Sequence, residues 1–388
     1  MSPRKKTQQI SIGMAVVILL VAAVIEIFQQ STPGSTTETP AAGITSVSEQ
    51  ADVSLPAWLK VYFTNPNPPD NLGNGIDRFV QSAVDSAATS IDAASFDLNL
   101  PDLVKALASA KKRGVTVRVV YDGVNGNLDL ENDATGNKPF NAVKTLKAAG
   151  VKLVDGGRSN GLMHDKFLII DGKLLFVGSW NLAYNDTYRN NNNLLEISDS
   201  RLIANYQAKF NELFVDKLFG THAEVQVPNP ELTISGTAVE NYFSPTDHVM
   251  EKLIQYVQNA QKSVHFMAFT YTDQDLASAM IDRAQAGLDV QGVIENRASS
   301  QGALPLLFCT GLPVKTDGNK YTMHHKVIIV DGKIVITGSF NFTKAADNDN
   351  DDNVIVLHSP AAAQLFEQEY QTVNAAGQAP SSADMKCK

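Results

Sequence analysis

Hydrophobic residues occur along this chain in short runs separated by polar turns. In the first half, Val80–Ala88 and Leu100–Lys112 have the apolar spacing of amphipathic helices. Val115–Tyr121 is instead a short, β-branched run bounded by Gly114 and Asp122, as is typical of a buried parallel strand. The pattern therefore predicts an α/β fold with mixed, largely parallel sheets flanked by helices.

The same order of runs occurs twice, so the chain contains an internal repeat. The corresponding segments are Val61–Thr64 and Asn241–Ser244, Ser90–Phe96 and Ser263–Phe269, and Lys112–Val120 and Gln285–Val293. Each half is predicted to run strand, helix, strand, helix, strand and then a shared motif. The main difference in length is the polar loop Asn125–Pro139 of the first half. We expect two similar α/β halves packed as one unit about a pseudo-two-fold axis.

The shared motif reads His-x-Lys-x4-Asp and, after six further residues, Gly-Ser-x-Asn. The first copy supplies His164, Lys166, Asp171, Ser179 and Asn181. The second copy supplies His324, Lys326, Asp331, Ser339 and Asn341. A single histidine is more often a structural residue than a catalytic one, but duplication of the whole string argues against that interpretation here. The other histidines are interpreted as structural, and the side chain of His325 is expected to point to the face opposite that of His324.

Each motif falls on a predicted β-hairpin. Phe167–Ile170 and Leu174–Val177 are strand-like, and the Asp171-Gly172 pair between them is typical of a two-residue turn. Because side chains alternate along a strand, the motif histidine and lysine point to the same face. The serine and asparagine lie at the end of the returning strand and approach the same spot. Asp171 and Asp331 fall at the turns, where we expect a supporting, structural role.

Two imidazoles and two ammonium groups around one centre suit phosphodiester chemistry. One histidine can attack phosphorus while the other protonates the leaving oxygen. The lysines and asparagines can stabilise the charge of the five-coordinate transition state, and the serines can hold phosphate or neighbouring side chains. The covalent intermediate is a phosphohistidine, resolved by water or another alcohol. This chemistry requires neither a metal nor another cofactor.

A nucleophilic histidine needs an acceptor on its other ring nitrogen, which fixes the tautomer. Asp352 follows His324 by 28 residues and is predicted to serve the second half. The equivalent residue of the first half is Asn192, which can accept a hydrogen bond but cannot offset imidazolium charge. Two alternatives remain open: Glu196 reaches His164 through a changed strand register, or the two histidines differ in basicity.

The duplicated motif resembles the signature of the phospholipase D superfamily, and the resemblance covers about Val61–Asn374. It implies two α/β halves, one active site at their interface, a phosphohistidine mechanism and metal independence. It also implies that His164 is the nucleophile and His324 the acid, although Asn192 departs from the family pattern. The stretch Gly338–Ala346 is especially similar to small bacterial secreted or periplasmic endonucleases of the superfamily.

Composition helps to weigh the possible substrates. The chain is 44% hydrophobic and carries a net charge of −9, whereas a sequence-independent nucleic-acid binder usually presents a basic surface. We therefore expect hydrolysis of phospholipids, with an exported or membrane-tethered endonuclease acting on DNA or RNA as the alternative. A phosphatidyltransferase similar to cardiolipin synthases is a further alternative. A catalytically inactive binding module is disfavoured because both histidines and both lysines are present.

The N-terminal segment predicts a membrane attachment. Arg4, Lys5 and Lys6 precede an apolar run of 19 residues, Ile10–Phe28. Residues 1–28 are therefore predicted to be a cytoplasmic stub and a transmembrane anchor, with the catalytic part outside the cytoplasm; a cleaved signal peptide and a buried helix are the alternatives. Residues 29–54 are rich in Ser, Thr, Pro, Gly and Ala and predict a flexible linker.

The remaining boundaries follow from the repeat. We expect a first half at residues 55–228, a second half at 229–376 and a tail at 377–388. A monomer is expected because both motifs lie in one chain. Only two cysteines are present, Cys309 and Cys387. They either pair in an oxidising compartment or remain as one buried thiol and one free thiol on the tail.

Overall fold

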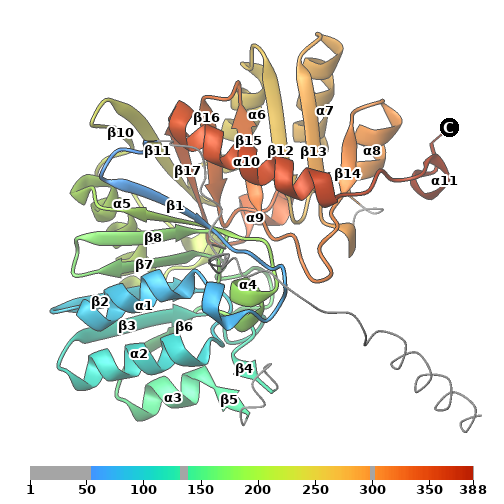
Figure 1. Cartoon of the computed structure of the whole chain (residues 1–388). Coiled ribbons are helices and arrows are strands. Elements are labelled where there is room, and N and C mark those ends of the chain that lie inside the picture. Colours follow the sequence, from blue (N-terminus) through green and yellow to red (C-terminus); the bar gives the residue numbers. More distant parts are fainter. Residues whose placement is uncertain (1–53, 132–138, 298–301, 388) are drawn as a thin grey trace, which may run out of the picture. The chain divides into compact units, whose positions relative to one another are not determined.

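Two large β-sheets flanked by helices form most of the described part of the protein (Figure 1). The structure is a computed structural model that describes residues 54–131, 139–297 and 302–387. The predicted anchor and all but the last residue of the predicted linker lie outside these ranges. Among the described helices, none combines the length and the apolar composition needed to cross a bilayer.

The first sheet has seven strands in the order β1-β9-β8-β7-β2-β3-β6. They are β1 (Leu59–Phe63), β2 (Ser90–Ser95), β3 (Thr116–Tyr121), β6 (Lys152–Asp155), β7 (Lys166–Ile170), β8 (Leu174–Gly178) and β9 (Asn193–Ile197). A separate small ribbon is formed by β4 (Asp129–Leu130) and β5 (Phe140–Asn141). The helices of this half are α1 (Asp77–Ser86), α2 (Pro101–Lys112), α3 (Ala142–Ala148), α4 (Tyr184–Tyr188) and α5 (Ser200–Asn211).

The second sheet has eight strands in the order β10-β11-β17-β16-β15-β12-β13-β14. They are β10 (Glu231–Ile234), β11 (Thr237–Ser244), β12 (Ser263–Ala268), β13 (Asp289–Ile294), β14 (Val314–Thr316), β15 (Lys326–Val330), β16 (Ile334–Gly338) and β17 (Asp352–His358). The helices are α6 (Val249–Gln258), α7 (Gln274–Gln285), α8 (Leu304–Cys309), α9 (Lys344–Asn348), α10 (Pro360–Ala376) and α11 (Ser382–Met385).

The predicted mixed α/β architecture and its duplication are confirmed. The sheets are mixed as expected, but antiparallel pairs outnumber parallel ones, so the expectation of largely parallel sheets is wrong. Among the named strands, parallel pairing is confined to β2-β3-β6 and to β12-β13-β14, because the motif hairpins and the strands beside them pair in antiparallel fashion. The two amphipathic patterns correspond to α1 and α2, which bury residues such as Val80 and Leu107. Each half also has a further helix and strand before the motif, α3-β6 and α8-β14. The sequence pattern missed these elements because they are short and partly exposed.

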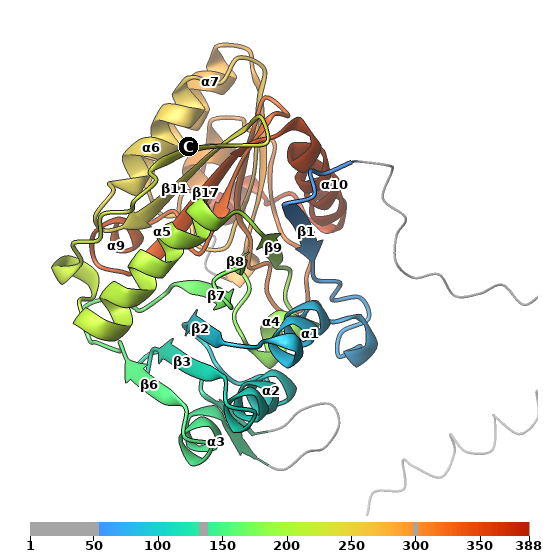
Figure 2. The same ribbon diagram turned by 90° about the vertical axis from the view of Figure 1, so that its left-hand side faces the viewer.

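The two halves share one hydrophobic core although each sheet belongs to a single half. The central cluster takes Phe167 and Val177 from the first sheet and Val327 and Val335 from the second. Helix α5 packs on β2 and β7, while α10 packs on β12 and β16 and reaches β1 of the other half (Figure 2). The strands of the two sheets fall on either side of the expected boundary at residues 228/229, but the packing joins both parts.

The end of the chain is attached to the second half. Cys309 at the end of α8 forms a disulfide with Cys387, with a distance of 5.3 Å between the two Cα atoms. The alternative of two separate thiols is therefore wrong. Backbone hydrogen bonds in both directions between Thr316 and Gln378 also hold the start of the predicted tail.

The two motif hairpins are closed by loops of three residues, one more than the sequence predicted. In the first, Ile170 pairs with Leu174, and Asp171 and Gly172 both have positive φ angles, of 54° and 61°. The Asp171 carboxylate accepts hydrogen bonds from the backbone amides of residues 88, 89 and 90 at the start of β2. These bonds lower the pKa of Asp171 despite the opposing effect of burial, so the carboxylate is ionised at neutral pH.

Asp331 repeats this arrangement in the second half. Its carboxylate accepts from the amides of residues 261, 262 and 263, which lead into β12. The two motif aspartates therefore attach each hairpin to its neighbouring strand, and neither is directed at the motif histidine of its own half. The structural role expected for them agrees with this placement.

Asp171→Ala and Asp331→Ala are each expected to lower the free energy of unfolding by about 1–2 kcal/mol, because each leaves several loop amides without their acceptor. Urea unfolding followed by tryptophan fluorescence measures the change. The control is Asp102→Ala, which removes an exposed ion pair with Lys105 and should shift the midpoint little. Wild-type midpoints for both motif variants would contradict the structural role.

Candidate active site

Each motif histidine lies just before its hairpin and is held by the backbone of the opposite half. The amide of His164 donates to the carbonyl of Asp351 at 2.9 Å, and that of His324 donates to the carbonyl of Asn191 at 2.9 Å. Isolated β-bridges also join Met163 to Asp351 and Met323 to Asn191, so each residue before a motif histidine pairs with the opposite half. The two motifs therefore meet at the interface between the halves.

The side chains of the histidines are also oriented across this interface. His164 Nδ1 lies 2.6 Å from Oδ1 of Asp352, and His324 Nδ1 lies 2.9 Å from Oδ1 of Asn192. The expectation that Asp352 serves His324 of its own half is therefore wrong. Asp352 begins β17 beside the end of β16, and the pseudo-two-fold arrangement makes this edge face the motif of the other half. The spacing of residues within one half cannot show that its acceptor contacts the histidine of the other half.

The motif serines hold these two acceptors in place. Ser339 Oγ donates to Asp352 Oδ1 at 2.6 Å, and Ser179 Oγ donates to Asn192 Oδ1 at 2.8 Å. Both serines are fully buried. Each half thus contributes a serine and an acceptor that together orient the histidine of the other half.

Glu196 does not take part in the site. Strand β9 pairs with β1 so that Glu196 lies opposite Lys60, and its carboxylate binds Lys60 Nζ and the hydroxyl of Tyr62, both at 2.7 Å. The changed register that would bring Glu196 to His164 is not observed. The other alternative, that the two histidines differ because one faces a carboxylate and the other an amide, agrees with the geometry.

The two lysines are buried beside the histidines. Lys166 Nζ donates to the carbonyl of His164 at 2.8 Å, and Lys326 Nζ donates to that of His324 at 2.7 Å. The same ammonium groups lie over aromatic rings, 5.4 Å from the centre of Phe96 and 4.6 Å from that of Phe269. Each ring also contacts the motif histidine of its half edge-on. The repeat places these two phenylalanines at equivalent strand ends, but the sequence pattern alone indicates no role for them.

The two imidazoles and the two ammonium groups influence one another's pKa values. Burial lowers the pKa of His164, and the Lys166 charge lowers it further. Burial also places the pKa of His324 well below its ordinary value, with contributions from Lys326, Lys166 and His164. The pKa of Lys166 falls to about 8, chiefly through burial. Burial favours a protonated Asp352, but the charge of His164 and its hydrogen bond outweigh this and lower the pKa of the carboxyl. Such a site gains stability when an anionic group enters it.

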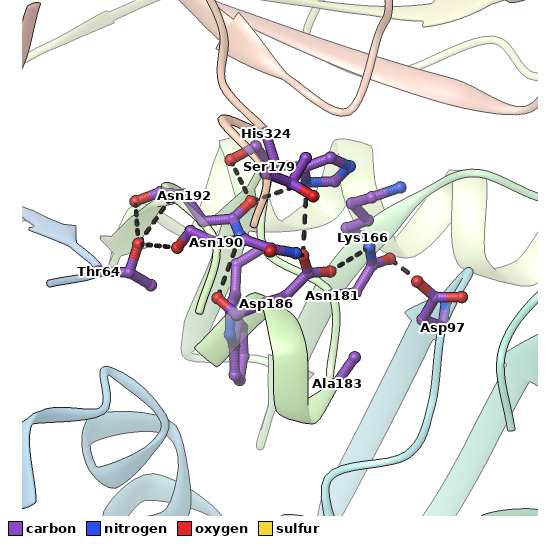
Figure 3. A network of polar contacts seen from close by, with 12 residues as sticks. Thr64, Asp97, Lys166, Ser179, Asn181, Ala183, Asp186, Asn190, Asn192 and His324 are labelled. Carbon is purple, nitrogen blue, oxygen red and sulfur yellow. Dashed lines mark hydrogen bonds and ion pairs between the residues drawn. The ribbon is translucent and has the colours of Figure 1, made fainter. Parts of the chain in front are cut away.

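The motif asparagines have different surroundings. Asn181 Nδ2 donates to Oδ2 of Asp186 at 2.6 Å, and its Oδ1 accepts from the backbone amide of Asp97 at 3.3 Å. Asn341 Oδ1 is buried and accepts no hydrogen bond from the part of the chain that the structure describes. Figure 3 shows Asn181, Lys166 and Asp97 grouped beside His324. Sequence reasoning missed Asp186, although comparing the two halves residue by residue would have shown a carboxylate present in one of them only.

The arrangement provides what a phosphoryl transfer requires. It has two oriented imidazoles for attack and proton donation, two ammonium groups for the non-bridging oxygens, and amide groups beside them. In residues 54–131, 139–297 and 302–387, no group of three or more His, Cys, Asp or Glu side chains is placed to hold a metal ion.

Known proteins are similar to this chain in sequence and in fold. The family model described as "Cardiolipin synthase, PLD-like domain" matches residues 80–214 and 253–373. Mitochondrial cardiolipin hydrolase of Chlamydomonas reinhardtii is 29% identical over 130 residues, which are 33% of this chain and 58% of that protein. Phospholipase D of Rickettsia bellii (strain RML369-C) is 32% identical over 139 residues, 35% of this chain and 69% of that protein.

The chain spans about 60% of the length of the cardiolipin hydrolases that it matches (58% and 61%). Among solved structures, phosphatidylserine synthase of Haemophilus influenzae Rd KW20 has a similar fold, with a TM-score of 0.62 at 12% identity. That likeness covers 81% of this chain and 86% of the synthase. With both halves matched by one family model and both motifs joined at one interface, the chain belongs to the phospholipase D superfamily.

Proposed function

We propose that this protein is a phosphodiesterase that hydrolyses phospholipids through a phosphohistidine intermediate, with phosphatidic acid as one product. One observation carries the proposal: two buried imidazoles are each oriented at Nδ1 by an acceptor of the opposite half. This leaves the Nε2 atom of each ring for chemistry. The two buried lysines supply positive charge at the same centre.

In the proposed reaction, Nε2 of His164 attacks phosphorus, and the bond to the alcohol oxygen breaks. Asp352 stabilises the positive charge that His164 acquires, which favours His164 as the nucleophile. Protonated His324 donates its Nε2 proton to the departing oxygen. His324 then accepts a proton from water as that water attacks the phosphohistidine, so both rings return to their starting states. Lys166 and Lys326 offset the charge of the non-bridging oxygens.

Phospholipid is favoured over nucleic acid by the surroundings of the site. Asp97 and Asp186 lie within electrostatic range of Lys166, and burial together with the Asp186 charge raises the pKa of Asp97 to about 6. Carboxylates here disfavour a polyanion, which needs a basic track on both sides of the reacting phosphate.

An apolar side chain is also available at this edge of the sheet. Val124 is 62% exposed in the loop after β3. This loop lies next to the site, because its Asp122 accepts a hydrogen bond from the backbone amide of Met163, the residue before His164. The curated relatives named above as a cardiolipin hydrolase and a phospholipase D support the same substrate class. We include in the proposal that residues 1–28 anchor the protein and that its catalytic part acts outside the cytoplasm on a bilayer surface.

His164→Ala and His324→Ala are each expected to reduce turnover at least about 10³-fold, because each removes one of two groups that act in sequence. Wild-type activity should persist in EDTA, since lysines and histidines supply the charge. The assay uses full-length protein in detergent and a soluble chromogenic phosphodiester, with His222→Ala as an exposed-histidine control. Full activity of either motif variant, or strict metal dependence, contradicts the mechanism.

Full-length protein is expected to release phosphatidic acid from phospholipid vesicles and to leave single-stranded and duplex DNA and RNA intact at the same concentration. Lipid chromatography and gel electrophoresis measure the two activities, with His324→Ala as the blank. Nucleic-acid cleavage without lipid hydrolysis overturns the lipid assignment in favour of the endonuclease alternative. A phosphatidyl-alcohol product in added ethanol shows that an alcohol also accepts the phosphatidyl group.

The value of kcat/KM is expected to fall already as pH rises toward neutrality, because burial and the neighbouring lysines hold the pKa of His324 well below its ordinary value and its acid form is lost first. The fall is expected to become steeper above about pH 8, where Lys166 loses its proton and no longer offsets phosphate charge. A profile from about pH 5 to about pH 10 measures the limb. A rate that stays constant up to about pH 10, the ordinary lysine pKa, contradicts the role of a buried, protonated Lys166.

A further inference from the structure

The two halves of the site differ at two equivalent positions that face each other. Asn192 of the first half corresponds to Asp352 of the second, each 13 residues after its motif serine. Asp186 on α4 corresponds to Ala346 on the equivalent helix α9. The second half therefore places the carboxylate of Asp352 directly against His164. The first half places the carboxylate of Asp186 behind Asn192, one side chain further from His324.

Asp186 is buried, 3% exposed, and it accepts hydrogen bonds from three asparagine amides. Its Oδ2 accepts from Asn181 at 2.6 Å. Its Oδ1 accepts from Asn190 at 2.6 Å and from Asn192 at 3.2 Å. Figure 3 shows these three amides converging on the carboxylate below His324.

Asp186 orients the amide of Asn192 through two acceptors. The Nδ2 group of Asn192 donates to the backbone carbonyl of Asp186 at 3.1 Å and to its carboxylate at 3.2 Å, so Nδ2 faces Asp186. Asn192 Oδ1 must then face Ser179 Oγ at 2.8 Å and His324 Nδ1 at 2.9 Å. An oxygen at that position requires a hydrogen on Nδ1 of His324 and leaves Nε2 free. The Asp186 carboxylate itself is 3.7 Å from His324 Nδ1, so its charge also acts on the ring.

We propose that Asp186 is a positioning residue that replaces, in this chain, the carboxylate missing at Asn192. Through Asn192 it fixes the tautomer of His324, and through Asn181 it orients an amide beside Lys166. The first half carries this negative charge at position 186, whereas the second half carries it at position 352, and the Asp186 charge reaches His324 through the amide of Asn192. The inference rests on the proposed function, because the activity it affects is that of the same site.

Four variants separate this role from simple support of the fold: Asp186→Ala, Asp186→Asn, Asn192→Asp, and the double variant Asp186→Ala with Asn192→Asp. Each Asp186 single variant is expected to reduce kcat by about 10- to 100-fold with little change in KM, since the amide of Asn192 loses its carboxylate acceptor, keeps only the backbone carbonyl of residue 186, and fixes the tautomer less firmly. Asn192→Asp alone places two carboxylates in contact and should also lose activity. The double variant reproduces the pattern of the second half and should recover to within about 10-fold of wild type.

Kinetics use full-length protein and a soluble chromogenic phosphodiester. Asp77→Ala is the matched control, because Asp77 is a buried carboxylate that binds Tyr188 of α4 at 2.9 Å and touches none of the three amides. It should lower stability and leave kcat unchanged. The pH limb of the double variant should lie above that of wild type, because a carboxylate now contacts His324 directly.

Nitrogen NMR of protein labelled at histidine reports the tautomer without relying on turnover, with His324→Gln identifying the signal. We expect wild-type His324 to carry its proton on Nδ1, and Asp186→Asn to give a mixture of both tautomers. Wild-type kcat and an unchanged tautomer in Asp186→Asn overturn the proposal. A folded double variant no faster than Asp186→Ala overturns it as well. Where wild type shows no phosphodiester turnover, the proposed function fails and the NMR result alone decides the role of Asp186.

Discussion

The site depends on one constraint: each motif histidine is held by the opposite half. The backbone amides of His164 and His324 and their Nδ1 atoms all bond to residues of the partner half. A buried imidazole without such partners would be costly to desolvate and free to rotate. The shared core holds the two sheets in fixed positions. The hydrogen bonds between the halves then fix the orientation of both imidazole rings and of their reactive Nε2 atoms. Fold stability and site geometry therefore have the same origin.

Much of this arrangement could be predicted because it is local in the sequence. The repeat, the hairpins and the common direction of His164 and Lys166 follow from strand periodicity and turn chemistry within a few residues. The structural role assigned to Asp171 also rested on its place at a turn. The errors were equally local: the loop at Asp171 is one residue longer than expected, and short, half-exposed elements such as α3 left no clear periodic signal.

What could not be predicted lies between segments far apart in the chain. Position 352 is near His324 in sequence, but the pseudo-two-fold arrangement presents Asp352 to His164, and periodicity carries no information about that exchange. The pairing of Cys309 with Cys387 likewise depends on how the end of the chain folds back. Asp186 could not be found from the motif for another reason. A motif contains only the residues that both copies share, whereas the equivalent of Asp186 in the second copy is Ala346.

The exchange of partners also bears on how such a duplicated chain can diverge. A substitution at Asn192 affects His324, and one at Asp352 affects His164. A sequence change in one half therefore alters the catalytic histidine of the other. Covariation is then expected to run between halves, with position 192 also coupled to position 186 on its own side. On the role proposed for Asp186, each half supplies one carboxylate to the histidine of the other half, at position 352 in the second half and at position 186 in the first, so two halves of the same fold are specialised for different tasks at one centre.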